Sequence, residues 1–268
     1  MWPMLTAGCN RGSSHAPENE DAHSPFGDRL AELRRQIYRN TDTVFEKALF
    51  YKPLDGSAPD EIIKLAPLIV QEVDGSQPVD ASFKLAGPTV YYESKTVRVG
   101  DQDQNAMVFS WRHGNDVQFR DRAIRMTLGD DGFPVIFETN VNSDSQLRIL
   151  FVSKSFEEAA AAGNAAVLPE RQFLIETSVD NAPHVVVARV IEDGPMPMGP
   201  FVYLSRDNSS FTTLICRCMP SQARQFVETA YYELRPASDS NEPPSSKFPF
   251  DLDAPAKILR IPQSPKRD

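Results

Sequence analysis

The sequence predicts an α+β fold, in which a mainly antiparallel sheet carries one helix from the N-terminal part of the chain and one from the C-terminal part. Segments with strand composition outnumber segments with helical periodicity, and most of them follow one another directly. The alternating strand–helix units of a parallel α/β sheet are missing. Of the 268 residues, 41% are hydrophobic, which is enough for the core of one large domain.

The first helix is predicted over Phe26–Asn40, directly after the start signal Ser24–Pro25. Val44–Leu49 is expected to continue its apolar face. A second, short helix is predicted between Pro59 and Pro67. The apolar face of the first helix is formed by Leu30, Leu33 and Ile37, which recur at helical spacing.

From Leu68 onward the pattern changes to short segments rich in Val, Ile, Tyr and Thr, which are typical of strands. Polar turns at Gly100–Asp103, Gly129–Gly132 and Arg206–Ser209 predict three hairpins. A helix is predicted over Phe156–Ala162. The predicted strands are Leu68–Val70, Thr89–Val99, Met107–Arg112, Ile124–Leu128, Val135–Phe137, Leu147–Val152, Phe173–Ile175, His184–Ile191, Phe201–Leu204 and Phe211–Met219.

The strongest helical pattern begins at Pro220–Ser221 and ends at Pro236. The folded α+β domain is therefore expected to span residues 26–236. Residues 237–268 are rich in Pro and Ser and are expected to be mostly disordered, with an edge strand at Ile258–Ile261. The apolar stripe of the C-terminal helix consists of Ala223, Phe226, Val227, Ala230, Tyr231 and Leu234.

The N-terminal segment Leu5-Thr6-Ala7-Gly8-Cys9 places small residues before a cysteine, and a polar stretch follows it. This arrangement resembles the lipobox and tether of bacterial lipoproteins. The resemblance implies that residues 1–9 are a short, atypical lipoprotein signal ending at a lipidated Cys9, and that residues 10–25 are a flexible tether. It also implies a lipid-anchored protein of the bacterial cell envelope, on its periplasmic or extracytoplasmic side.

Charge and motifs limit the function classes. The net charge of −9 argues against nucleic-acid binding, which needs clustered Lys and Arg. The sequence contains no run of about 18 apolar residues that would span a bilayer as a helix. Walker, nucleophile-elbow, dinucleotide-binding and His-Glu-x-x-His motifs are also missing. We therefore expect a non-catalytic binding or structural module without a cofactor, which contacts the membrane through its anchor and an envelope protein or ligand of unknown identity.

Cys216 and Cys218 are the main candidates for chemistry in the folded domain. On a strand both would point to the same face as Leu214, whereas Ile215 would point to the opposite face. One interpretation is that the two thiols fill a core face. A disulfide between them is disfavoured, because residues two apart on a strand lie near the upper limit of about 7 Å for bridged Cα atoms.

The other interpretation is a soft-metal site for copper. Met196 and Met198 precede the last predicted hairpin and Met219 follows Cys218. Thioether and thiolate sulfur are the ligands that select Cu(I), and short Met-x-Met and Cys-x-Cys patterns resemble those of envelope copper carriers. A turn over Arg206–Ser210 would place Met198 opposite Cys218, and a tighter turn would place it opposite Met219.

A third hypothesis is a thiol-dependent or hydrolytic envelope enzyme. It would require Cys216 or Cys218 to contact either His113, at the end of a predicted strand, or His184, at the start of another. A thiol on an apolar strand face lacks the environment that lowers a cysteine pKa, so the sequence favours the non-catalytic interpretation.

Overall fold

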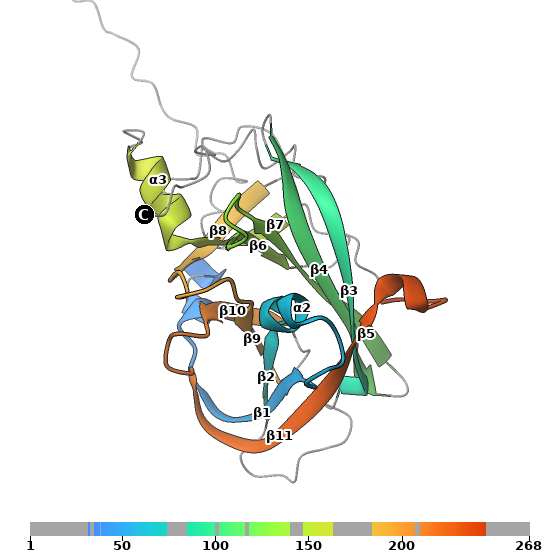
Figure 1. Ribbon diagram of the computed structural model, residues 1–268. Helices are drawn as coiled ribbons and strands as arrows, with labels where there is room; N and C mark the ends of the chain where they lie inside the picture. The colour runs from blue at the N-terminus through green and yellow to red at the C-terminus, as the bar shows by residue number, and fades with distance from the viewer. Residues whose placement is uncertain are drawn as a thin grey trace, which may run out of the picture.

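The computed structural model describes residues 32, 35–37, 39–73, 85–99, 102–115, 118–139, 147–162, 184–206 and 210–244. Its strands form one sheet in the order β10-β9-β2-β1-β11-β3-β4-β5-β6-β7-β8. The sheet curls until its two end strands, β10 and β8, lie side by side, which produces a nearly closed barrel-like shape (Figure 1). The predicted α+β class is therefore wrong, since the described part of the chain is mostly β-structure.

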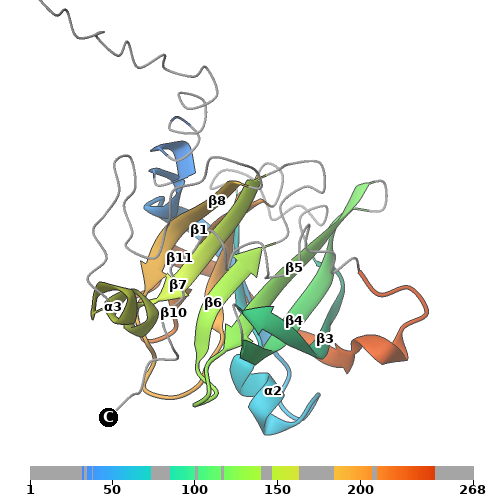
Figure 2. The same ribbon diagram turned by 90° about the horizontal axis from the view of Figure 1, so that it is seen from above.

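The bounds of the elements are as follows. The strands are β1 (Phe45–Pro53), β2 (Leu68–Glu72), β3 (Leu85–Val99), β4 (Gln102–Asn115), β5 (Gln118–Leu128), β6 (Pro134–Thr139), β7 (Leu147–Ser153), β8 (His184–Ile191), β9 (Pro200–Leu204), β10 (Phe211–Cys216) and β11 (Ala223–Pro236). The helices are α2 (Asp60–Leu65), α3 (Lys154–Ala162) and the 3-10 turn η2 (Ala237–Asp239). Figure 2 shows α2 and α3 on different sides of the sheet.

The sheet combines local antiparallel pairs with long-range parallel pairs. Strands β3 to β7 pair antiparallel in chain order. Strands β2 and β9 pair in parallel, as do β7 and β8. The last strand, β11, lies in the middle of the sheet, where it pairs in parallel with β1 over Phe45–Pro53 and with β3 over its final residues Glu233–Pro236.

The predicted C-terminal helix is strand β11. Its second half alternates as a strand does, because Tyr232 and Leu234 are buried whereas Arg235 is exposed. Its Phe, Val, Thr and Tyr residues suit a pleated strand, and pairing with two neighbours outweighs the helical spacing of its apolar residues. The N-terminal helix also stops earlier than its apolar pattern suggested. The backbone is helical at the described positions between 32 and 41, but Val44–Leu49 leads into and forms most of strand β1.

The local predictions hold better. The short helix α2 and the helix α3 are confirmed, as are the hairpins β3–β4, β5–β6 and β9–β10. In the last hairpin Cys216 pairs with Pro200, which is the register expected for a turn over Arg206–Ser210. The predicted strands Phe173–Ile175 and Ile258–Ile261 lie outside the described residues, as do Cys9 and the tether.

The main core fills the interior of the barrel-like sheet. Trp111 of β4 meets Phe211 of β10 with ring centroids 6.1 Å apart, so side chains from distant strands contact each other inside. The Tyr232 hydroxyl donates a hydrogen bond to the Pro67 carbonyl at 2.5 Å. A side chain at Gly199 would collide with the Leu65 carbonyl at the end of α2, so glycine allows β9 to begin against this helix.

Two of the buried charged side chains form an ion pair between β5 and β6. The Arg125 guanidinium donates to the Glu138 carboxylate at 2.6 Å, and both side chains are almost completely enclosed. Such a pair is weak evidence for stability, because desolvation of two ions offsets most of their attraction. We regard the pair as a structural feature that specifies how β5 and β6 align, since Arg125 and Glu138 are also register partners in the ladder.

The buried His113 is expected to make the stability of the fold depend on pH. Its imidazole is buried on β4, and neither ring nitrogen has a hydrogen-bond partner within the described structure. Burial, and to a smaller extent the charge of Arg122, lowers the pKa of His113 from 6.5 to about 4. The folded protein therefore keeps this histidine neutral at pH values where the unfolded chain protonates it.

We predict that the free energy of unfolding falls as the pH is lowered from about 6.5 to about 4. Between these values the unfolded chain binds a proton that the folded chain does not, which amounts to about 3 kcal/mol over the full window. Urea unfolding of the wild-type chain and of His113→Leu between pH 7.5 and 4 measures this term. The free energy of unfolding of the wild type, measured relative to that of His113→Leu, should fall toward low pH. A constant difference between the two would contradict the prediction.

Candidate functional site

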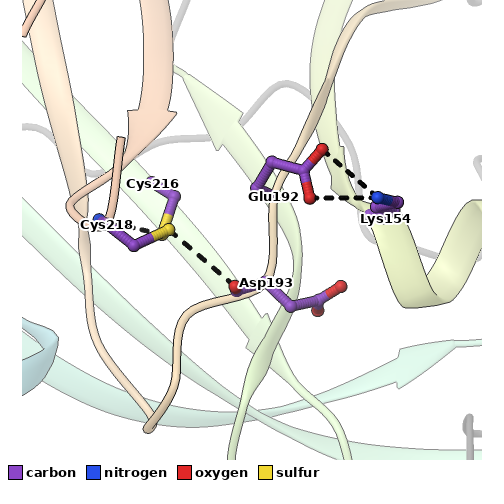
Figure 3. The surroundings of a disulfide bond; sticks show 5 residues. All are labelled: Lys154, Glu192, Asp193, Cys216 and Cys218. Carbon is purple, nitrogen blue, oxygen red and sulfur yellow. Dashed lines mark hydrogen bonds and ion pairs between the residues drawn. A yellow bond between two sulfur atoms is a disulfide. The ribbon is translucent and has the colours of Figure 1, made fainter. Parts of the chain in front are cut away.

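Cys216 and Cys218 form a disulfide, with their Cα atoms 5.2 Å apart (Figure 3). The expectation that their spacing disfavours a disulfide is wrong, because the strand ends at Cys216 and the chain then turns. The Met219 amide donates to the Cys216 carbonyl at 3.1 Å within this turn, which brings the two cysteines closer than an extended strand would. Cys216 is buried and belongs to the same core cluster as Leu214. Cys218 is exposed.

Methionines line the two hollows that Cys216 of this disulfide also lines. Met196, Met198 and Cys216 line one small pocket, together with Asp193 and Gly194 from the segment after β8. Met198 packs against the core, whereas Met196 is 48% exposed. The structure therefore brings together three of the four residues in the copper interpretation, with Cys218 bonded to the third. Met219 lies in a neighbouring hollow that shares Cys216 as a wall.

Asp193 lies close to the sulfur of Cys218, and Gly194 lies close to the sulfur of Met198. The Cys218 Sγ lies 3.8 Å from the Asp193 carbonyl oxygen. A Cβ atom on Gly194 would lie 3.1 Å from the Met198 Sδ, so this thioether rests against the glycine backbone. The disulfide and the Met198 thioether are thus both placed by two consecutive residues.

The carboxylates near the pocket are bound to helix α3. Asp193 accepts hydrogen bonds from the Ser155 amide at 2.8 Å and from the Ser155 hydroxyl at 2.9 Å, and its carboxylate points away from the disulfide (Figure 3). Glu192 pairs with Lys154 at 3.3 Å. Both contacts stabilise the first turn of α3, where a negative charge is favourable. The Asp193 carboxylate therefore caps the helix, and the Glu192 carboxylate is engaged in an ion pair with Lys154.

Arg217 connects the turn between the two cysteines to the end of helix α2. Its guanidinium donates to the carbonyl of Ala66, directly after α2. Burial lowers the pKa of Arg217 to about 10, and the nearby Tyr232 partly opposes this effect. Arg217 thus stays charged at neutral pH, and its contact holds the turn between the two cysteines against the end of the barrel-like sheet.

His113 and His184, the histidines of the described part of the chain, do not join this site. His113 lies inside the sheet and lines neither pocket that contains Cys216. His184 is the first residue of β8 and pairs with Leu147, at the opposite end of that strand from Glu192 and Asp193. Because Cys216 and Cys218 are bonded to each other, neither is a free thiol nucleophile in this structure.

The described residues lack the usual kind of metal-binding cluster. The described residues contain no group of three or more His, Cys, Asp or Glu side chains arranged to hold a metal ion. The sulfur group around the disulfide is of a different kind, because thioethers contribute to it. Among the described helices, none has the length and apolar character needed to cross a bilayer.

A second feature, which the sequence analysis missed, is an aromatic row across three strands of the sheet, partly buried at Phe201 and Phe50 and exposed at Phe226 and Tyr231. The rings of Phe201, Phe50 and Phe226 follow one another across β9, β1 and β11, with centroid distances of 6.1 and 5.1 Å. Tyr231 extends the row beneath the ammonium group of Lys52. Phe226, Val227 and Tyr231 are 38 to 49% exposed. Simple strand alternation gives no signal for it, because Phe226 and Tyr231 lie an odd number of residues apart and Arg224 to Thr229 are all exposed.

The comparisons with known proteins leave the family open. No protein-family model, no curated protein and no solved structure matches this chain.

We predict that the fold survives without the disulfide. The bridge closes a loop of only three residues, so a loop-entropy estimate gives it about 1.6 kcal/mol of stabilisation. Urea unfolding of Cys216→Ala/Cys218→Ala should show a loss of that size with an unchanged denaturant slope. A loss above about 4 kcal/mol would contradict the prediction, and so would loss of the near-UV circular dichroism that fixed side-chain packing produces.

Proposed function

We propose that this protein is a lipid-anchored, non-catalytic binding module of the bacterial cell envelope, which captures an extended segment of another envelope protein at the edge of β11. The lipobox-like sequence Leu5–Cys9 supports the anchor. The disulfide Cys216–Cys218 supports an oxidising, extracytoplasmic compartment, because disulfides persist there and are rare in the cytosol.

The observation that carries the binding part of the proposal is the open first half of β11. Between Ala223 and Tyr232 the strand pairs with β1 on one side, whereas its described ladder with β3 begins only at Glu233. Arg224 to Thr229 are exposed along this half, on both faces of the strand. A strand edge of this kind is a template for an added strand, with backbone hydrogen bonds providing affinity.

The aromatic row gives this edge a side-chain surface. Phe226 and Tyr231 would contact alternate side chains of an added strand, and large amphipathic rings are enriched at protein interfaces. A register shift between β1 and β11, which opposes Ala48 to Phe226 and Leu49 to Glu228, turns Phe226 onto the face of Phe50. The net charge of −9 opposes pairing of two copies of this chain, so we assign the edge to a different protein.

The anchor is tested in the bacterium that encodes the chain, with expression from its own locus. We expect labelled palmitate on Cys9 and recovery of the protein with the membrane fraction. Cys9→Ser should lose both, whereas Cys218→Ser should keep both, because Cys218 belongs to the disulfide. An unlabelled wild-type chain recovered with the cytosol would contradict the anchor.

The edge is tested with a photoreactive amino acid placed at Val227 in the same cells. We expect one discrete adduct with an envelope protein, and we expect its yield to fall at least fivefold when Phe226→Ser and Tyr231→Ser are added. The matched control carries the photoreactive group at Leu54, which is equally exposed but lies outside the aromatic row. Equal labelling at both positions, or an adduct only with a second copy of the chain, would contradict the proposal.

A further inference from the structure

We propose that the sulfur pocket is a redox-gated Cu(I) site, in which reduction of the Cys216–Cys218 disulfide releases two thiolates that bind the ion together with Met198. This inference does not depend on the edge of β11, because it rests on a different part of the molecule. In the disulfide form described above the two sulfurs are bonded to each other, so they cannot act as thiolate ligands.

The donor set of the pocket is the first argument. Met196, Met198 and Cys216 line one cavity, and Cys218 is held beside it through its contact with Asp193. Thiolate and thioether sulfur prefer soft, monovalent copper over the hard cations that oxygen ligands select. The pocket therefore offers sulfur from Met196, Met198 and Cys216, with Cys218 beside it, and Cu(I) binds such sulfur with two or three ligands.

The second argument is that the competing ligands near the pocket are already engaged. The Asp193 carboxylate binds Ser155 at the start of α3, and the Glu192 carboxylate binds Lys154. Among the described residues that line the pocket there is no histidine. Zn²⁺ completes its tetrahedral shell with imidazole or carboxylate when fewer than four thiolates are present. The surroundings thus disfavour zinc and leave copper as the fitting ion.

Exposure gives the pocket a direction. Met196, at 48% exposed, lies at the surface, while Met198 packs against the core and Cys216 is buried. Cys218 is exposed, so an incoming thiol can reach its sulfur. We infer that Met196 receives the ion at the mouth and that Met198 and the two thiolates retain it.

The gating step requires a reductant, which we identify by class as a dithiol. One thiolate of the dithiol attacks the Cys218 Sγ and displaces the Cys216 thiolate, and the second thiolate then releases Cys218 as the dithiol itself becomes a disulfide. Two electrons and two protons pass to the protein. Binding of Cu(I) then displaces the protons of the two thiols, so the affinity rises with pH.

Anaerobic titration of the full chain with Cu(I), buffered by a chromogenic chelator, tests the proposal. The chain reduced by a dithiol, with the reductant removed, should bind one Cu(I). The oxidised chain should bind at least 100-fold more weakly. Met198→Leu should lower the affinity of the reduced chain at least tenfold and reduce the number of sulfur neighbours of copper in X-ray absorption. Met107→Leu is the matched control, because Met107 is a buried methionine of β4 that does not line the pocket.

Each of the following results would overturn the proposal. The first is equal Cu(I) affinity in the reduced and oxidised chains. The second is stoichiometric binding that survives Cys216→Ser/Cys218→Ser, which would place the ion elsewhere. The third is an affinity of Met198→Leu equal to that of Met107→Leu, or Zn²⁺ binding by the reduced chain that Cu(I) cannot displace. Far-UV spectra of each variant establish that it is folded before its titration is interpreted.

Discussion

The parallel pairing of β11 with β1 is the interaction on which the rest of the structure depends. The strands β10, β9, β2 and β1 form one part of the sheet, and β3 to β8 form the other. Strand β11 joins the two, because it pairs with β1 along most of its length and with β3 over its last four residues. The two parts can curl toward each other only because the C-terminal strand returns to the middle, and this return also places Tyr232 and Leu234 in the shared core.

This dependence also explains how much of the fold could be predicted from sequence. The hairpins β3–β4, β5–β6 and β9–β10 are local, so turn residues and strand composition were sufficient to find them. The pairs β1–β11 and β2–β9 join residues more than a hundred positions apart, and no local pattern encodes them. The segment Ala223–Pro236 carries apolar residues at spacings compatible with either a helix or a strand, and tertiary pairing decides between them.

Sequence reasoning placed Met198 near the two cysteines, but it did not predict the bond between them. The hairpin register, read from its turn, correctly brought the Met198 region toward the two cysteines. The disulfide depends on where β10 stops, and the sequence pattern extended that strand beyond Cys216 to Met219. The tethering of Asp193 and Glu192 to α3 depends on contacts across 38 residues, which spacing alone does not reveal. The aromatic row was missed because Phe226 and Tyr231 had been assigned to a helix face.

The position of the disulfide within the sheet gives its opening a structural meaning. Strands β10 and β8 are the two ends of the sheet order, so the described ladders do not cross the line where they meet. The loop from Glu192 to Gly199 leads from β8 to β9, contacts Cys218 at Asp193 and carries both pocket methionines. A change in the bonding of Cys216 and Cys218 can therefore alter this seam while leaving every strand pair intact, because Cys218 lies beyond the end of β10. The junction made by β11 lies elsewhere in the sheet, so the fold can tolerate chemistry at the seam.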